Sequence, residues 1–566
     1  MKKSVKLFAA SVCAATMLLS ACGGSGNDTA STTGAAAATD PNAIINAYGC
    51  EPQNPLIPTN TNETCGGNPI DLLFAKLVAF DNEGNAKNEV AESITPNDDN
   101  TVYTVKIKDG WKFSDGTPVT AESFTKAWSY GANGKNGQVS SGFFANIAGY
   151  ADLNPTTPDG KTDEAKLAAL TGNEQLSGLK VEDDKTFTVT LTAASSTFPI
   201  QVGYTAFAPL PESFFADPAA FGEKPVTNGQ YKFDSWNHNQ NLKIVRNDDY
   251  KGNFPAKNGG IDFKVYTDTE PAYADISGGN LDIMDTVPNS AVKTFLQDEN
   301  VQAINNPGSV FQSFTFASNM KHFGLDQEGR LRRQAISMAF DRDQVNEKLN
   351  GGLATVATEW TSPVTPGYND KLEGNDVLKY NPDKAKQLWE QANAISPWGA
   401  DEKFQIAYNA DNGSKDQWDA ITNQISKTLG ITAEGAPYPT FKEMRTAVTK
   451  RQITTAFRSG WQPDYPSPES YLVSLYASSA ADGNGSNDGD YKNPAFDDFM
   501  TKAAVAKSTD EANQYYQEGE KILFQDLPAV PLWYTSAKAV AAKNVQNVAT
   551  NWKNEPDYAS LAKPAA

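Results

Sequence analysis

The chain of 566 residues has very little histidine: only His238 and His322 are present. Neither lies near a second histidine or a cysteine, so we expect no zinc site and no other metal site. Catalysis that needs a histidine base has equally little support. The glycine fingerprints of nucleotide-binding enzymes and the Gly-x-Ser-x-Gly elbow of hydrolases are also missing. These absences argue against an enzyme and against a bound cofactor.

Positive charge is scarce as well. Lysine and arginine number 48 against 68 aspartates and glutamates, which leaves a formal net charge of −20. Nucleic acid and anionic lipid surfaces are bound through basic patches, so this acidic balance argues against both as partners. An acidic surface mainly serves solubility, and it says little more about function.

No apolar run is long enough to cross a membrane. The N-terminal run Leu7–Leu19 follows three lysines and leads through small residues to Cys22. A bilayer core of about 30 Å needs about 20 apolar residues, so this segment is too short for a spanning helix. The pattern predicts a lipoprotein signal peptide over residues 1–21 with a lipid on Cys22, and an ordinary secretory signal is the alternative. We expect a body outside the cytoplasm, anchored to the cell membrane by that lipid alone.

Residues 22–42 are rich in Gly, Ser, Thr and Ala and predict a flexible spacer.

The remaining cysteines form one pair. Cys13 leaves with the signal and Cys22 carries the lipid, which leaves Cys50 and Cys65. In an exported protein such a pair predicts a disulfide, worth about 3 kcal/mol for a loop of this size. Two free thiols are the alternative.

Helix and strand signals alternate along the chain. Residues 101–108 and 185–192 alternate apolar and polar side chains, the pattern of half-buried strands. Asn381 precedes a proline and a helical repeat of apolar residues, which predicts a helix N-terminus. Ser508 and Glu511 predict a capping box at the start of a helix that runs toward residue 523. The class is therefore mixed α/β, and the length predicts two or three domains.

Six short blocks follow one another in a fixed order. They are Trp111–Ala121, Val226–Tyr231, Val245–Tyr250, Gly278–Ile283, Arg333–Arg342 and Leu527–Leu532. In this order they resemble the family 5 extracellular solute-binding proteins, which are the receptors for peptides, nickel and some sugars in ABC importers. The likeness covers nearly all of residues 43–560. Asp115-Gly116 and Pro118 in the first block are turn and strand-end residues, so that block indicates fold rather than ligand.

The resemblance implies a two-lobed α/β fold of the type II (class C) periplasmic-binding-protein kind with an extra subdomain. One discontinuous lobe would consist of residues 43–75, 198–310 and 532–566. The extra subdomain would cover residues 76–197, and the second lobe residues 311–531. A ligand would bind between the lobes, which close about their connecting strands, and the closed monomer would meet a membrane permease.

Residues 458–465 carry the ligand signal. They resemble the R-x-G-W-x-x-D-Y block of the oligopeptide-binding branch, in which the aspartate takes the α-ammonium of a peptide. The resemblance implies Asp464 as the anchor, Trp461 and Arg458 as pocket walls, and Tyr465 beside them. Gln462-Pro463 precedes the aspartate, and the proline stiffens the chain there. The resemblance therefore does not determine the shape of the neighbouring pocket. Without the resemblance, Asp464 would be interpreted as a turn residue.

Two other segments supply candidate contacts. Residues 311–319 align with the family's crossover between lobes, where the backbone can pair with an extended peptide as with an added strand. An alternating aromatic strand is equally typical of a core. Residues 143–144 fall near a position where relatives place an aromatic side chain against the ligand. The candidates are Ser313, Phe314, Phe316, Phe143 and Phe144.

We therefore expect a lipid-anchored substrate-binding protein that captures oligopeptides and delivers them to the permease of an ABC importer. One alternative keeps the fold and binds an oligosaccharide or a metal complex. A secreted hydrolase is a second alternative, and cleavage of peptides by the purified protein would support it. A surface adhesin or signalling receptor is the remaining alternative.

Overall fold

The computed structural model describes residues 38–565, apart from residues 62, 158–161, 289, 411–413, 440 and 484. The expected signal peptide 1–21, the lipidated Cys22 and nearly all of the spacer lie outside the described residues. The spacer is expected to reach residue 42, but Thr39–Asp40 already form a strand that pairs with Lys563–Pro564, so the folded body begins earlier. Residues Thr39–Ala566 form one compact unit. No helix in the described part of the chain combines the length and apolarity needed to cross a bilayer.

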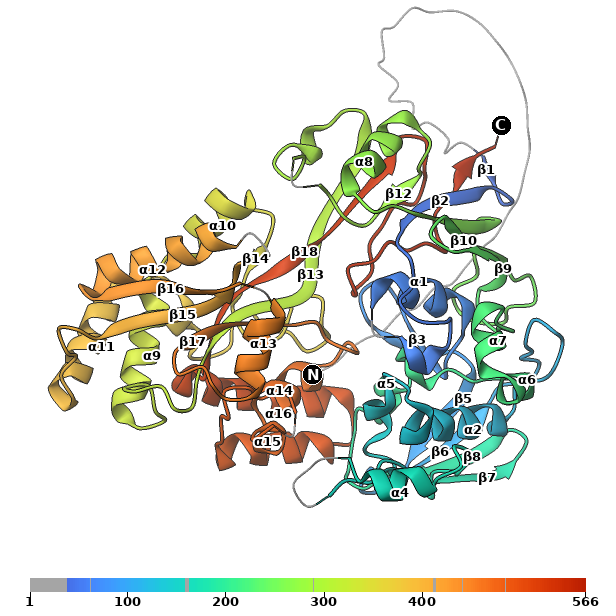
Figure 1. The fold of residues 1–566 in the computed structure, drawn as a ribbon, viewed down its shortest axis with the longest axis horizontal. Helices are drawn as coiled ribbons and strands as arrows, with labels where there is room; N and C mark the ends of the chain where they lie inside the picture. Colours follow the sequence, from blue (N-terminus) through green and yellow to red (C-terminus); the bar gives the residue numbers. More distant parts are fainter. Residues whose placement is uncertain are drawn as a thin grey trace, which may run out of the picture. The chain divides into compact units, whose positions relative to one another are not determined.

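Two long antiparallel strands, β13 and β18, organise this unit (Figure 1). β13 is Val301–Phe316 and β18 is Ala529–Ala542, and their pairing runs from Val301 opposite Ala542 to Thr315 opposite Ala529. They lie in the middle of one sheet with the order β16-β15-β17-β13-β18-β12-β2-β11-β10-β9. The two strands thus connect two groups of elements that lie far apart in the sequence.

The first group corresponds to the expected discontinuous lobe. Its strands are β1 (Thr39–Asp40), β2 (Ile44–Gly49), β9 (Tyr231–Asn237), β10 (Asn241–Arg246), β11 (Gly260–Val265), β12 (Ile283–Met284) and β19 (Lys563–Pro564). Its helices are α1 (Thr64–Leu73), α5 (Phe198–Gln201), α6 (Glu212–Ala216), α7 (Pro218–Glu223) and α8 (Thr269–Gly278). β2 pairs in parallel with β11 and β12, and β9–β11 form an antiparallel meander.

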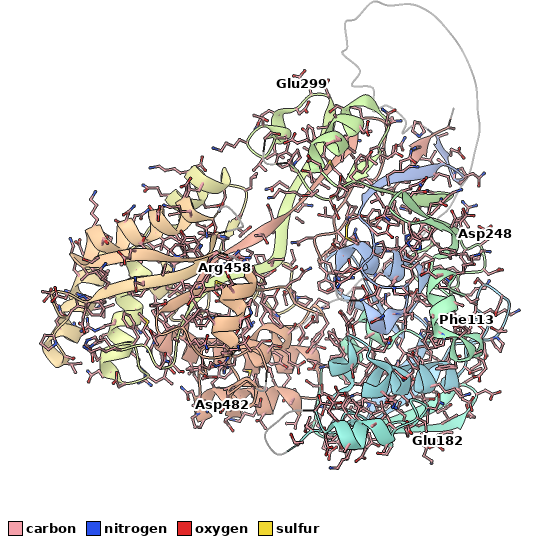
Figure 2. All side chains as sticks on the ribbon, in the orientation of Figure 1. Phe113, Glu182, Asp248, Glu299, Arg458 and Asp482 are labelled. Atoms are coloured by element: carbon pink, nitrogen blue, oxygen red, sulfur yellow. A yellow bond between two sulfur atoms is a disulfide. The ribbon has the colours of Figure 1, made fainter. Side chains whose placement is uncertain are left out.

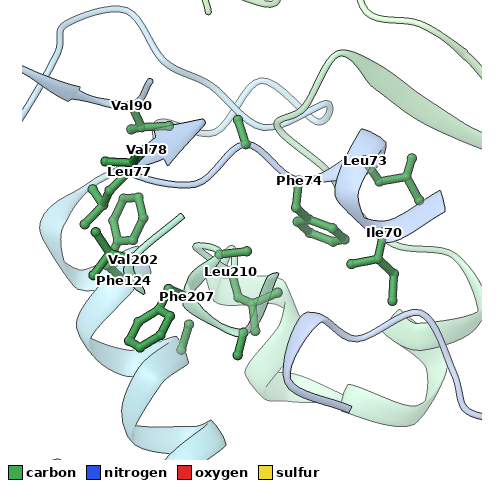
Figure 3. Packing of buried hydrophobic residues seen from close by; sticks show 14 of the residues in the cluster. Ile70, Leu73, Phe74, Leu77, Val78, Val90, Phe124, Val202, Phe207 and Leu210 are labelled. Carbon is green, nitrogen blue, oxygen red and sulfur yellow. The ribbon is translucent and has the colours of Figure 1, made fainter. Parts of the chain in front are cut away.

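A separate four-stranded antiparallel sheet, β5-β6-β8-β7, lies within the expected extra subdomain. The subdomain contains β3 (Val78–Phe80), β4 (Ala86–Asn88), β5 (Ala91–Pro96), β6 (Val102–Ile107), β7 (Leu179–Asp183), β8 (Thr186–Thr190), α2 (Ala121–Ala132), α3 (Tyr150–Leu153) and α4 (Glu164–Ala169). β6 and β8 confirm the two strands predicted from alternation. Their inward side chains share one continuous core with the first lobe, part of which is shown in Figure 3.

The second group of elements corresponds to the expected second lobe. Its strands are β14 (Thr355–Val356), β15 (Lys403–Asn409), β16 (Thr432–Tyr438) and β17 (Ala456–Trp461). Its helices are α9 (Gln327–Met338), α10 (Arg342–Asn350), α11 (Pro382–Ile395), α12 (Lys415–Leu429), α13 (Phe441–Thr449), α14 (Pro468–Tyr476), α15 (Pro494–Ala504) and α16 (Thr509–Asp526). Two apolar clusters fill it, one around β15 and β17 and one around α14–α16.

Both predicted helix N-termini are present. The Asn381 side chain accepts a hydrogen bond of 3.0 Å from the amide of Lys384 at the start of α11. Ser508 accepts one of 3.2 Å from the amide of Glu511 at the start of α16. The Glu511 carboxylate, however, accepts from the amide of Lys507, one residue before the N-cap. The predicted capping box is therefore only half formed.

The first family block builds scaffold. Trp111 and Phe113 are buried, and the Trp111 ring meets Tyr250 edge-on at 5.6 Å between centroids. The Asp115 carboxylate accepts from the amide of Thr117 at 2.9 Å, which closes the tight turn. Gly116 takes a φ of +88°, a left-handed conformation that favours glycine. The block thus holds the subdomain together and lies apart from the cavities described below.

A disulfide joins Cys50, just after β2, to Cys65 in α1, with the two Cα atoms 5.1 Å apart. Two of the expected limits between the lobes, at residues 310/311 and 531/532, fall inside the continuous strands β13 and β18. The strands themselves therefore mark no boundary there, and these limits remain a proposal. The hydrophobic core likewise runs across the expected limit at residue 75/76.

Candidate functional site

A cavity of about 750 Å³ opens on the second lobe, beside the paired strands β13 and β17. Its other walls come from the start of α13 and from the loop between α14 and α15. Arg458, labelled in Figure 2, projects from β17 at this position. A volume of this order accommodates a ligand of several hundred daltons. The main lining side chains are Val310, Gln312, Ser313, Thr315, Phe441, Met444, Arg445, Arg458, Ser459, Trp461 and Gln462.

Hydroxyl groups form one wall of the cavity. Ser459 of β17 lies within hydrogen-bond distance of Ser313, at 2.8 Å, and of Thr315, at 2.7 Å. The antiparallel register places Ser313 opposite Ser459, so these short side chains meet across the two strands. The predicted candidate Ser313 therefore lies in the cavity wall.

Arg458 and Trp461 also line the cavity, as the resemblance implied. The Arg458 guanidinium lies 5.6 Å from the centre of the Phe441 ring, a cation–π distance. Phe441 begins α13 and is 48% exposed, so an aromatic face borders the opening. The buried indole N–H of Trp461 finds no acceptor among the described residues.

Asp464 follows the end of β17 and precedes α14, just beyond the residues that line the cavity. Its backbone amide donates to the Ser470 hydroxyl at 3.1 Å. Its carboxylate has no hydrogen bond or ion pair within the described part of the chain, and burial raises its pKa to about 6. The negative charge of Asp464 in turn adds to burial in raising the pKa of Tyr204, in the first lobe. The aspartate is thus a desolvated, unpaired charge that faces the other lobe.

Tyr465 does not line the cavity. Its hydroxyl donates to the Glu469 carboxylate at 3.2 Å and accepts from the Gln201 amide at 3.3 Å. Thr197, beside Gln201, also donates to Glu469. Since Thr197 and Gln201 belong to the first lobe and its subdomain, Tyr465 takes part in a polar contact between the lobes.

Phe314 and Phe316 lie in the hydrophobic core, contrary to the expectation that they contact ligand. They are 0% and 4% exposed and pack against Phe323 and Phe404. The alternation of β13 turns these two rings away from Ser313 and Thr315, which take the cavity side.

The backbone of residues 311–316 offers no free edge to an added strand, which corrects the expectation of strand-like pairing there. β17 pairs with one edge of this segment and β18 with the other. A segment in the middle of a sheet has both of its hydrogen-bonding edges occupied.

The two aromatic candidates of the subdomain differ. Phe144 is fully buried and meets Phe207 edge-on at 5.1 Å, so it belongs to the core rather than to a ligand surface. Phe143 is partly buried and stacks on Tyr204 with ring centres 4.0 Å apart. It therefore lies next to Tyr204, the tyrosine whose pKa the charge of Asp464 helps to raise. Phe143 does not line the cavity beside β13 and β17.

Sequence reasoning missed Phe441, Arg445 and the loop around Asp488. Arg445 forms an ion pair of 2.7 Å with Asp488, and both line the cavity. Asp488 also lies 3.4 Å from Arg451. None of the six family blocks covers these residues, and a charged loop alone does not indicate a pocket wall.

Comparison with known proteins assigns the family. Residues 85–483 match the model of the bacterial extracellular solute-binding proteins, family 5. The chain belongs to this family. Its members are extracellular solute-binding proteins, not enzymes.

Relatives and solved structures of this family match nearly the whole chain. The dipeptide-binding protein DppE of Bacillus subtilis is 25% identical over 492 residues, covering 85% of this chain and 84% of DppE. The murein tripeptide binding protein MppA, in its unliganded open form, superimposes with a TM-score of 0.77 at 21% identity, covering 93% of this chain and 98% of MppA. The oligopeptide-binding protein AppA of Bacillus subtilis, in complex with a nonapeptide, gives a TM-score of 0.67 at 19% identity, covering 94% of this chain and all of AppA. This family fold is the two-lobed α/β fold that the sequence blocks predicted.

Proposed function

We propose that this protein captures oligopeptides between its two lobes and delivers them to the permease of an ABC importer. The unpaired, partly buried carboxylate of Asp464 is the observation that supports a peptide ligand most directly. A peptide brings an α-ammonium group that would pair with it. Relatives that are named for binding dipeptides, oligopeptides and murein tripeptides point the same way.

The energetics favour this anchor. A positive charge about 4 Å from the carboxylate is worth on the order of 4 kcal/mol at an effective dielectric near 20, before desolvation. Asp464 is already partly desolvated in the free protein, so part of that cost is met by folding rather than by binding. The ammonium of the ligand would therefore be recognised by a charge that is preorganised for it.

The cavity that begins at Trp461 would hold the peptide's side chains. Phe441 and Trp461 supply aromatic surface, while Arg458 and Arg445 supply positive charge. The hydroxyl groups of Ser313, Thr315 and Ser459 offer adaptable hydrogen bonds. A mixed lining of this kind suits ligands whose side chains vary.

The decisive experiment compares trialanine with N-acetyl-trialanine by isothermal titration calorimetry. The free amine is expected to bind the unmodified protein more than tenfold more tightly than the acetylated peptide. Asp464→Asn should lose that difference, because a neutral amide no longer distinguishes the two ligands. Asp248→Asn is a matched control, since Asp248 is 78% exposed on the first lobe (Figure 2). An unchanged preference in the Asp464→Asn variant would refute the anchor.

The same anchor gives a pH dependence. The carboxylate binds an ammonium only when it is ionised, and its pKa in the free protein is raised to about 6 by burial. Trialanine affinity should therefore fall as the pH drops below about 6, and Asp464→Asn removes this step. Above about pH 7 the α-ammonium of the peptide, with a pKa of about 8, begins to lose its proton, which weakens binding separately. Calorimetry between pH 5 and pH 8 measures it, and a flat profile in the unmodified protein speaks against the proposal.

We further propose that a lipid on Cys22 anchors the protein outside the cytoplasmic membrane. The support is the sequence alone, because Cys22 lies outside the described residues. Cys22→Ser should move the protein from the membrane fraction to the soluble extracytoplasmic fraction. Retention of that variant on the membrane would argue for a different attachment.

A further inference from the structure

A second cavity, of about 370 Å³, adjoins the first on the side of the connecting strands. Val310 and Gln462 line both cavities, so the two are contiguous. The remaining wall comes from the first lobe: the end of β2, the disulfide, the start of α1, residues 285–286 and residues 553–555. A ligand bound beside Trp461 would therefore have this second space within reach.

Two acceptors in this wall lack donors. The Asp285 carboxylate receives a hydrogen bond only from its own backbone amide and forms no ion pair in the described part of the chain. The Asn68 side chain is 8% exposed, and its buried carbonyl oxygen has no donor there. Asn68 is buried and Asp285 is partly buried. Buried acceptors normally have partners, so these two acceptors offer a place for a donor group from outside the chain.

Two lysines of this region bind other carboxylates. Lys553 forms an ion pair with Asp71, to which Lys76 also binds at 3.0 Å. Glu555 lies 3.7 Å from Lys553, so this lysine is shared by two carboxylates. Lys553 thus serves Asp71 and Glu555, and Lys76 serves Asp71. Neither ammonium group forms an ion pair with Asp285.

The surroundings of Asp285 are consistent with a missing cation. Burial raises its pKa to about 6, and the charge of Glu555 adds to the effect. The pKa of the Tyr48 hydroxyl, in the same wall, is raised by burial and by the charges of Asp285 and Asp268. No group of His, Cys, Asp and Glu among the described residues has the geometry of a metal site, which favours an organic cation.

We propose that the second cavity is a specificity subsite for a positively charged side chain, lysine or arginine, of the bound peptide, with Asp285 as its determinant. The ammonium or guanidinium group pairs with the Asp285 carboxylate and donates to the carbonyl oxygen of Asn68. It supplies the positive partner that Lys553 and Lys76 do not give Asp285. The assignment rests on the peptide-binding function proposed above.

The test uses three alanine tripeptides that carry lysine at the first, second or third position, each matched with the norleucine peptide of similar shape. Calorimetry with the unmodified protein should find lysine at least tenfold tighter than norleucine at one position. Asp285→Asn should abolish that preference and leave the affinity for the norleucine peptide unchanged. Glu299→Gln, an exposed acid of the same lobe (Figure 2), should retain the preference.

Each outcome decides a distinct point. Equal binding of lysine and norleucine peptides at all three positions overturns the subsite and leaves peptide binding intact. An equal loss of both peptides in Asp285→Asn shows a structural role and also overturns it. Loss of the lysine preference in Asp464→Asn rather than Asp285→Asn assigns the cation to the other carboxylate and refutes the proposal. Failure of every peptide to bind removes the proposed function and the subsite together.

Discussion

Two glutamates without a ligand role are buried next to each other in the second lobe. Glu359 and Glu520 are 0% and 1% exposed and lie side by side in the core around α16. The backbone amide of Trp360 donates to Glu520 at 3.1 Å, and Thr361 donates to Glu359. Burial, aided for Glu359 by the charge of Glu520, raises both pKa values, that of Glu520 to about 8. The pair therefore keeps at least one proton at neutral pH.

This proton predicts a stability that falls as pH rises. The folded pKa of Glu520 lies above its ordinary value of 4.5, so the folded protein binds the proton more tightly than the unfolded chain. The stabilisation is complete below pH 4.5 and is lost as pH rises through about 8, by up to about 1.4 kcal/mol per pH unit. Glu520→Gln should flatten this slope and raise the free energy of unfolding at pH 8.

Urea unfolding of the full chain at pH 5, 6.5 and 8 measures this effect. Glu373→Gln is the control, because Glu373 is an exposed glutamate in the same region of the chain. Identical slopes for the unmodified protein and Glu520→Gln would mean that the pair is not protonated in the folded state.

At the scale of elements, the Cys50–Cys65 disulfide ties the end of β2 to α1. Both cysteines line the second cavity, together with Asp285 and Asn68. A cross-link that closes a loop of fifteen residues reduces the freedom of the unfolded chain. The connection therefore stabilises the lobe and holds one wall of the proposed cation subsite.

Replacing both cysteines by serine should lower the free energy of unfolding by about 3 kcal/mol. The preference for a lysine peptide should weaken more than the affinity for trialanine, because only the second cavity contains the disulfide. Urea unfolding and calorimetry measure the two effects. A stability unchanged within about 0.5 kcal/mol would show that the bond does not constrain the unfolded chain.

At the scale of the whole molecule, the extra subdomain and the first lobe contact the second lobe at another place besides β13 and β18. Asn100 donates to the carbonyl of Ala506 at 2.8 Å, and the Ser196 amide donates to that of Ala504 at 2.8 Å. Glu469 and Tyr465 add the polar contact with Gln201, only a few residues from Asp464. A movement of the lobes must therefore strain or rearrange this contact, which couples it to ligand binding.

Gln201→Ala removes donors to Tyr465 and Glu469, which lie 3.3 Å away in both cases. We expect a three- to tenfold gain of trialanine affinity, equivalent to about 0.7–1.4 kcal/mol, because closure no longer strains this contact, with little change in thermal unfolding because each lobe keeps its core. Gln175→Ala, an exposed glutamine of the subdomain, is the control. Unaltered affinity in Gln201→Ala would mean that the contact is the same with and without ligand.

Local patterns in the sequence predicted much of this architecture. Alternation located β6 and β8, and the cap residues Asn381 and Ser508 located the starts of α11 and α16. The ordered blocks indicated the family. The resemblance to that family then implied Arg458 and Trp461 as pocket walls, and both line the cavity. These signals are readable because capping and alternation depend on residues that are neighbours in the chain.

Other features depended on contacts that no local pattern contains. Alternation in β13 separates two sets of side chains, but only the packed lobe decides that Phe314 faces the core and Ser313 the cavity. Only the packed lobe likewise brings Asp285 into one cavity wall with Asn68, from a distant part of the sequence. By itself the sequence determined the family, the element types and a candidate anchor at Asp464. Tertiary structure alone decided which faces are buried and which charges stay unpaired, because burial and pKa depend on groups brought together from distant parts of the chain.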